Sequence, residues 1–174
     1  MEINNFDNLK EKMHCPKNVI TENLRICVVP SKEMAKLYVK ESSDKDRIGS
    51  SIEFPATYKV FLINDGSRDI KNINFSVSGF DGSGDELEYM DKREKSIRTM
   101  KTGKALLIEE LDYGLLDYAM DYTLKIYWMD GTHSKVCFEI FKSYGLKEET
   151  MSFEPILNSS AYHLELKDCA GSSK

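Results

Sequence analysis

The sequence contains no apolar run close to the roughly 20 residues that a membrane-spanning helix requires. Its opening, MEINNFDNLKEKMHC, also lacks the basic start and the apolar core of a signal peptide. These two absences predict a cytoplasmic protein that makes no membrane contact. The four cysteines are therefore expected to be free thiols, because a reducing compartment does not maintain disulfides.

Clustered positive charge is missing as well. The net charge is −5, and the lysines are scattered among carboxylates, so nucleic acid is an unlikely partner. The remaining composition is ordinary, with 41% hydrophobic and 30% charged residues in a chain of 174. This length is sufficient for one soluble domain with its own hydrophobic core.

The strong spacings of metal sites and catalytic centres do not occur. There is no C-x-x-C, H-x-x-x-H, H-E-x-x-H or G-x-S-x-G. His133 and Cys137 share one face of a predicted strand, but at about 3.3 Å per residue their backbones lie roughly 13 Å apart, too far for one zinc ion. We therefore assign no catalytic, cofactor-binding or metal-binding residue from the sequence, and we expect a protein that is not an enzyme.

A glycine-rich acidic segment, DGSGDELE, runs from Asp81 to Glu88 and resembles a calcium loop. The EF-hand pattern requires glycine at its sixth position and glutamate at its twelfth, where this chain has Glu86 and Lys92. We interpret the segment as a solvated turn between strands, with calcium binding as the alternative.

Alternating apolar and polar residues predict a series of short strands. These cover residues 24–29, 58–63, 73–78, 96–100 and 104–109, both arms of a hairpin between 121 and 141, and the later stretches MSFEPIL and YHLEL. Residues 31–41 fit either a helix capped by Ser31 or a half-buried strand, and we favour the strand. Residues 5–14 have apolar side chains at helical spacing and predict a short amphipathic helix that ends before Pro16.

The hairpin DYTLKIYWMDGTHSKVCFEIF fixes its own register. The apolar residues of both arms are even-numbered, so they share a buried face only if the loop has an odd length. A three-residue loop, Met129 to Gly131, meets this condition and places Gly131 at the left-handed position of a G1 bulge. A longer odd loop is the alternative, because the shorter one sets Lys125 opposite Lys135.

Strands of this length, with turn signals between them, predict an antiparallel β-sandwich. The passage IEFPATYKVFLINDGSRDIKNINFSVSGF resembles the early strands of bacterial immunoglobulin-like or fibronectin-like modules. DYTLKIYWMDGTHSKVCFEI resembles their closing pair of strands, with Tyr122 opening the penultimate one. The resemblance covers about residues 20–142 and implies an immunoglobulin-like fold.

The expected organisation has three parts. Residues 1–16 form an N-terminal extension with a short helix, residues 17–142 form the immunoglobulin-like sandwich, and residues 143–174 form a partly ordered C-terminal extension.

Large side chains in the connection between residues 111 and 121 predict a protein-binding surface, with a lid over one end of the sandwich as the alternative. The candidate partner-binding residues are Tyr113, Leu115, Leu116 and Tyr118, together with Tyr127 and His133 on the outward face of the hairpin. The expected function is a noncatalytic interaction or accessory module that binds another protein, or a second copy of itself, through a strand edge or this loop. A small-ligand-binding or metal-binding regulatory domain is the alternative.

Overall fold

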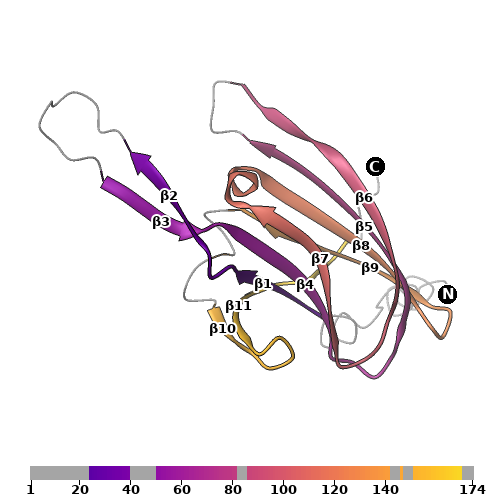
Figure 1. Ribbon diagram of the computed structural model, residues 1–174. Coiled ribbons are helices and arrows are strands. Elements are labelled where there is room, and N and C mark those ends of the chain that lie inside the picture. The colour runs from indigo at the N-terminus through magenta and orange to yellow at the C-terminus, as the bar shows by residue number, and fades with distance from the viewer. Residues whose placement is uncertain (1–23, 40–49, 82–85, 142–145, 147–150, 170–174) are drawn as a thin grey trace, which may run out of the picture.

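The computed structural model describes residues 24–39, 50–81, 86–141, 146 and 151–169, which form two main antiparallel sheets and a separate hairpin (Figure 1). The first sheet has the strand order β10-β11-β1-β4-β7, the second has β12-β9-β8-β5-β6, and β2 pairs with β3. The strands are β1 (Leu24–Pro30), β2 (Met34–Val39), β3 (Ser50–Pro55), β4 (Thr57–Asn64), β5 (Ile70–Asp81), β6 (Glu88–Met100), β7 (Lys104–Asp112), β8 (Ala119–Trp128), β9 (His133–Ile140), β10 (Met151–Glu154), β11 (Ser159–Leu164) and β12 (Lys167–Asp168). The predicted all-β sandwich is confirmed at this level, whereas the predicted N-terminal helix lies outside the described residues.

The core lies between the two main sheets, as the alternation of the strands requires. Along β8, every second residue from Met120 to Trp128 is buried, and β4, β5 and β9 alternate in a similar way. The buried side chains of both sheets form one apolar cluster. Tyr122 and Phe138 stack at its centre, with ring centroids 4.6 Å apart and planes 5° from parallel. Burial of apolar area of this kind is the main stabilising contribution to a β-sandwich.

The β8–β9 hairpin has the register that the sequence predicts. Leu124 pairs with Val136, and the loop contains three residues, Met129 to Gly131. Trp128 N–H donates to the carbonyl of Thr132 at 2.9 Å, and Gly131 has φ +86°, the conformation expected for a G1 bulge. The three-residue loop is therefore confirmed, and so is the pairing of Lys125 with Lys135.

Strand β6 is longer than predicted. It begins at Glu88, whereas the apolar alternation predicted a strand only from residue 96. Strand β6 is an edge strand of the second sheet, and most of its side chains are exposed. Its first half therefore carries charged residues on both faces. Asp81 and Glu88, the ends of the predicted acidic loop, are paired across β5 and β6, while residues 82–85 lie outside the described residues.

The C-terminal segment contributes strands to both sheets. Strand β11 pairs with β1 and also with β10, which extends the first sheet, and β12 pairs with β9 in the second. The two short strands predicted in this segment are therefore confirmed as β10 and β11. The favoured strand over residues 31–41 is confirmed as β2. Within the described ranges, no helix has the length and apolar character needed to cross a bilayer.

A polar contact joins the two sheets where β6 and β7 form their edges. The hydroxyl of Tyr122 on β8 donates to Glu109 Oε2 on β7 at 2.5 Å, and Arg93 on β6 forms an ion pair with the same carboxylate. Burial raises the pKa of Tyr122 above its ordinary range, and the nearby charge of Glu109 raises it further. Glu109 therefore has partners from the opposite sheet on both of its oxygens.

We expect Tyr122→Phe to lower the free energy of unfolding by about 1–3 kcal/mol, because Glu109 loses a hydrogen bond in a largely buried position. Urea denaturation at pH 7 measures this loss, and Tyr127→Phe on the outer face is the control, with an expected change within about 0.5 kcal/mol. The difference in free energy of unfolding between Tyr122→Phe and the wild type should decrease above about pH 10. At that pH Tyr122 ionises in the unfolded state but stays protonated in the folded state, so the wild type loses stability. Equal stability of both variants at pH 7 would contradict the assigned contact.

Candidate functional site

The connection rich in tyrosine and leucine forms a short 3-10 helix, η1 (Tyr113–Asp117), which Asp112 caps by accepting from Leu115 N–H at 3.0 Å. Leu116 is only 2% exposed and belongs to the core, and the partly buried Leu115 packs against the core cluster. Tyr113 stacks on Phe54 of β3 with a centroid distance of 3.7 Å, so it holds the base of the β2–β3 hairpin. Much of this predicted binding surface therefore covers the end of the core.

Tyr127 and His133 lie on the outer face of the second sheet, as predicted. They are paired across β8 and β9, and their ring centroids are 6.3 Å apart. His133 is exposed, and Cys137 lies on the same face of β9. Because His133 and Cys137 are four positions apart on one strand, their backbones are separated by roughly 13 Å, and the two side chains do not form a cluster.

An exposed apolar surface lies at the end of the β5–β6 hairpin, and we call Phe80, Leu87 and Tyr89 the aromatic patch. Their exposed fractions are 43%, 57% and 75%, and Phe80 pairs directly with Tyr89. The hydroxyl of Tyr118 lies 3.5 Å from Glu88, whose pair with Asp81 is on the opposite face of the hairpin from Phe80 and Tyr89. The sequence held a signal for Phe80, because it continues the outward phase of the alternation in INFSVSGF.

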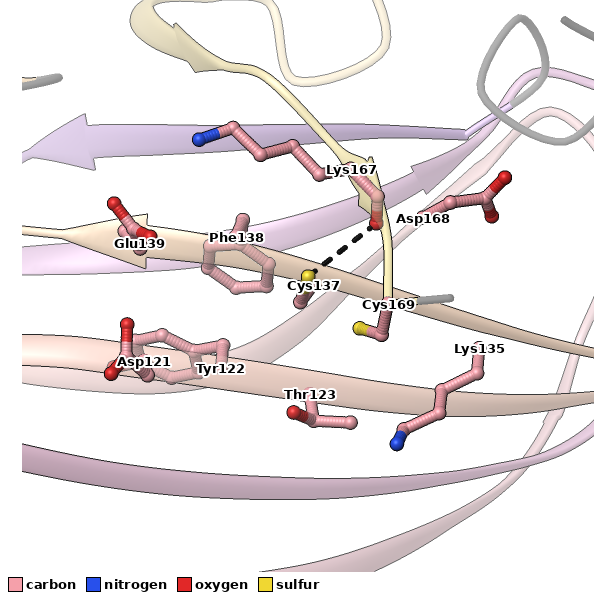
Figure 2. Close-up of a pocket in the computed structure, with 10 residues that line it drawn as sticks. All are labelled: Asp121, Tyr122, Thr123, Lys135, Cys137, Phe138, Glu139, Lys167, Asp168 and Cys169. Carbon is pink, nitrogen blue, oxygen red and sulfur yellow. Dashed lines mark hydrogen bonds between the residues drawn. The ribbon is translucent and has the colours of Figure 1, made fainter. Parts of the chain in front are cut away.

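A cavity of about 360 Å³ lies on the outer face of the second sheet, between β8, β9 and β12 (Figure 2). Cys137 donates to the carbonyl of Lys167 at 3.6 Å, and Cys169 lies beside it. Burial raises the pKa of Cys169 to about 12, and a hydrogen bond with Cys137 adds to this effect. Cys169 is therefore protonated at neutral pH and is a weak nucleophile.

Two carboxylates face each other at the other end of this cavity. Asp121 on β8 pairs with Glu139 on β9, and burial followed by repulsion from Glu139 raises the pKa of Asp121. Carboxylates are among the groups used in acid–base chemistry, and these two line the same cavity as Cys137 and Cys169.

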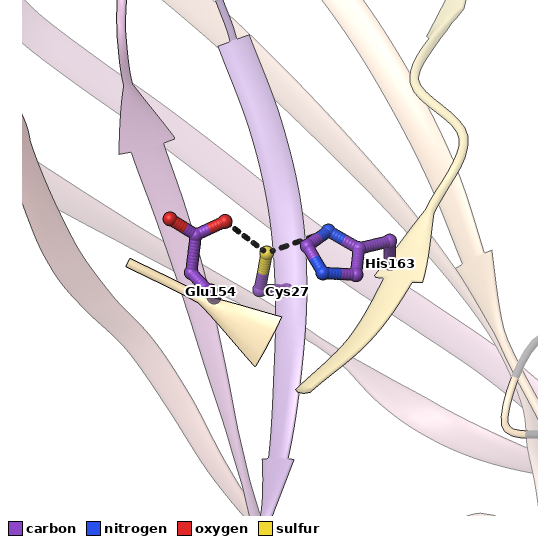
Figure 3. Close-up of side chains that lie close together, drawn as sticks. All are labelled: Cys27, Glu154 and His163. Carbon is purple, nitrogen blue, oxygen red and sulfur yellow. Dashed lines mark hydrogen bonds between the residues drawn. The ribbon is translucent and has the colours of Figure 1, made fainter. Parts of the chain in front are cut away.

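Three metal-ligating side chains meet on the outer face of the first sheet (Figure 3). They are Cys27 on β1, Glu154 at the end of β10 and His163 on β11, and their ligand atoms all lie within 4.8 Å of one another. Cys27 Sγ is 3.4 Å from His163 Nδ1 and 3.8 Å from Glu154 Oε2. Cys27 and Glu154 have no exposed surface.

The register of the strands explains how these side chains meet. Cys27 and His163 are directly paired across β1 and β11. The β10–β11 turn then packs Ile156 and Leu157 against a small buried cluster formed by Cys27, Ile63 and Ala161. The turn therefore excludes water from the side of the sheet that faces away from the main core.

The carboxylate of Glu154 is compensated where it is buried. Arg25 donates to Glu154 Oε1 from one guanidinium nitrogen and ion-pairs with Oε2 through the other, both at 3.2 Å. The backbone N–H of Ile156 donates to Oε1 at 3.1 Å. Arg25 also reaches Asp65 at 3.3 Å, so it connects the buried carboxylate to an exposed one.

The chemistry of Cys27 excludes a nucleophilic role in this conformation. Burial raises the pKa of its thiol to about 12, and the charge of Glu154 contributes in the same direction. A nucleophile requires an accessible thiolate, and Cys27 offers neither the access nor the charge. A thiol, an imidazole and a carboxylate are, however, ligands of zinc and related metal ions.

Sequence reasoning did not find this cluster. The one pair that it examined was His133 with Cys137, whereas His163 contacts Cys27, which is 136 residues away. His14 and Cys15 lie outside the described residues. The contact depends on the pairing of the first described strand with β11, and no local pattern specifies that pairing.

Comparison with known proteins assigns no relative to the chain. No family model matches it, and neither a curated protein nor a solved structure matches it. Because a fold does not define an activity, the side chains described above carry the functional assignment.

We expect Cys27 to resist alkylation by iodoacetamide at pH 8 in the folded protein and to react fully in urea, because folding both buries its thiol and raises its pKa. Peptide mass spectrometry after timed labelling measures each cysteine separately. Labelling of Cys27 at the same rate with and without urea would show that the thiol is accessible and would contradict the described burial.

Proposed function

We propose that this protein is a noncatalytic interaction module of the immunoglobulin-like or fibronectin-like class, which binds another protein through the aromatic patch. The strand order supports this class. Immunoglobulin-like sandwiches place their first two strands in one sheet and the third strand with the last two in the other. Here β1 and β4 share one sheet, while β5, β8 and β9 share the other, and the β2–β3 hairpin is an insertion between the first two.

The exposed sheet edges favour the patch over β-strand addition as the binding mode. Strand β6 carries charged residues along most of its length, β10 has four residues and β12 has two. Strand β7 contains an irregularity opposite Val60 and Phe61 of β4. Charges, short strands and bulges are features by which natural sheets avoid pairing with a further strand.

The aromatic patch is the observation that carries the proposal. Phe80 and Tyr89 are opposed on an outer sheet face, where two neighbouring aromatic residues contribute nothing to the core. Exposed aromatic side chains that lie together are typical of the central residues of protein interfaces. Leu87, which is also exposed, lies two residues before Tyr89 in the chain.

The charges around the patch define the kind of partner. Glu86, Glu88 and Asp91 are exposed beside it, and nearby carboxylates, Glu88 first among them, add to the desolvation that raises the pKa of Tyr118. A complementary partner presents an apolar or aromatic anchor flanked by lysine or arginine. We therefore propose a basic and aromatic segment of another protein as the occupant.

The double variant Phe80→Ser/Tyr89→Ser should lose at least about tenfold in affinity for the partner, because residues at the centre of an interface each contribute more than 1 kcal/mol. Met129→Ser/Phe153→Ser is the matched control, since these side chains are 61% and 60% exposed and lie outside the patch. Proteins captured from the native host by the wild type and the control, but not by the patch variant, are identified by mass spectrometry and then titrated as purified components.

Capture of the same proteins by the patch variant would refute the assigned surface. If sedimentation equilibrium shows that the wild type and the control are dimers and the patch variant is a monomer, the occupant of the patch is a second copy of this chain and not a different protein. Weaker binding at higher ionic strength is expected if the carboxylates around the patch contribute.

A further inference from the structure

The sulfur of Cys27 lies from its two neighbours, His163 and Glu154, at distances close to those between the ligands of a metal site. In a tetrahedral zinc site, bonds of about 2.0–2.3 Å place neighbouring ligand atoms about 3.3–3.6 Å apart. The distances of 3.4 Å from Cys27 Sγ to His163 Nδ1 and of 3.8 Å from Sγ to Glu154 Oε2 fall close to this range. The donor atoms of Glu154 and His163 lie within 4.8 Å of each other, so these two side chains must approach one another to complete the shell.

The types of donor select among metal ions. Calcium and magnesium favour sites made entirely of oxygen ligands, so a thiol and an imidazole argue against them. Zinc is bound by the combination of thiolate, imidazole nitrogen and carboxylate oxygen. We propose that Cys27, Glu154 and His163 bind one Zn²⁺ ion, with water at the fourth position.

The surroundings of the three donors form a built site. Each donor comes from a strand, and Cys27 and His163 are fixed by direct pairing of β1 with β11. Arg25 and the N–H of Ile156 orient the carboxylate of Glu154, as the groups around a metal site orient its ligands. These contacts hold the donors in place before any ion is bound.

The imidazole of His163 gives an independent indication. Its Nδ1 faces Cys27, whereas its Nε2 is buried and has no hydrogen-bond partner among the described residues. A metal-bound imidazole ordinarily donates from its second nitrogen to water or to an oxygen. A cavity of about 350 Å³ is lined by His163, Arg25 and residues 164–166.

The charges of the site balance on binding. Zn²⁺ displaces the proton of the Cys27 thiol, which goes to solvent, and the thiolate together with the Glu154 carboxylate neutralises the ion. Arg25 keeps its second partner, Asp65, at 3.3 Å. The bound ion would tie β10 and β11 to β1, at a place separate from the aromatic patch.

The test uses the full chain, purified without an affinity tag. We expect about one zinc per chain by elemental analysis, and a rise in melting temperature when zinc is returned to the chelated protein. Cobalt added in place of zinc should give a thiolate-to-cobalt charge-transfer band. Cys27→Ser and His163→Gln should each lower zinc affinity at least tenfold, and Cys27→Ser should abolish the cobalt band. The control variants Cys137→Ser and His133→Gln, on the other sheet, should keep the zinc affinity and the cobalt band of the wild type.

Circular dichroism of each apo variant shows whether it retains the fold, so a loss of zinc binding in a folded Cys27→Ser protein supports the site. If the folded wild-type protein binds no zinc and gives no cobalt band, that result overturns the proposed zinc site without any variant. Retention of the band in Cys27→Ser would also overturn the proposal, because the thiolate would then come from another cysteine. None of these outcomes depends on whether the aromatic patch binds a partner.

Discussion

Glu154 has no exposed surface, and the outer face of the first sheet is arranged around the partners that this carboxylate requires. Removing a carboxylate from water costs several kcal/mol unless charged and hydrogen-bonding groups replace the water. Arg25 on β1 and the turn after β10 supply those groups, and in doing so they fasten the β10–β11 hairpin to β1. The pairing of β1 with β11 brings His163 and Cys27 together, and the compensated carboxylate of Glu154 adds the third donor beside them.

A partly buried carboxylate at another edge of the sandwich also has charged and hydrogen-bonding partners. Glu109 on β7 is 10% exposed and is matched by Arg93 and Tyr122 from the opposite sheet. Removing one partner from such a group leaves a desolvated charge without compensation, which costs more than the intact contact contributes. Apolar burial thus drives the two sheets together, and these polar contacts link β7 of the first sheet to β6 and β8 of the second.

Local patterns predicted the parts of the fold that depend on local chemistry. Parity along the hairpin of β8 and β9 predicted a loop of odd length, because side chains of a strand alternate between two faces, and the structure has the shortest of the loops considered, with Gly131 at the G1 bulge. The first half of β6 was missed because an exposed edge strand has no apolar face to produce a pattern. The contact of Cys27 with His163 was missed because it depends on which distant strands pair, and single-strand patterns do not specify partners.

The claim that the buried carboxylate, thiol and imidazole form a metal centre is tested most directly by anomalous X-ray diffraction on both sides of the zinc absorption edge. Crystals of the untagged protein, grown with equimolar zinc, should give one anomalous peak about 2.0–2.3 Å from Cys27 Sγ, His163 Nδ1 and a Glu154 oxygen. A map without a peak between these atoms, or with zinc held only at Cys137 and Cys169, would contradict it.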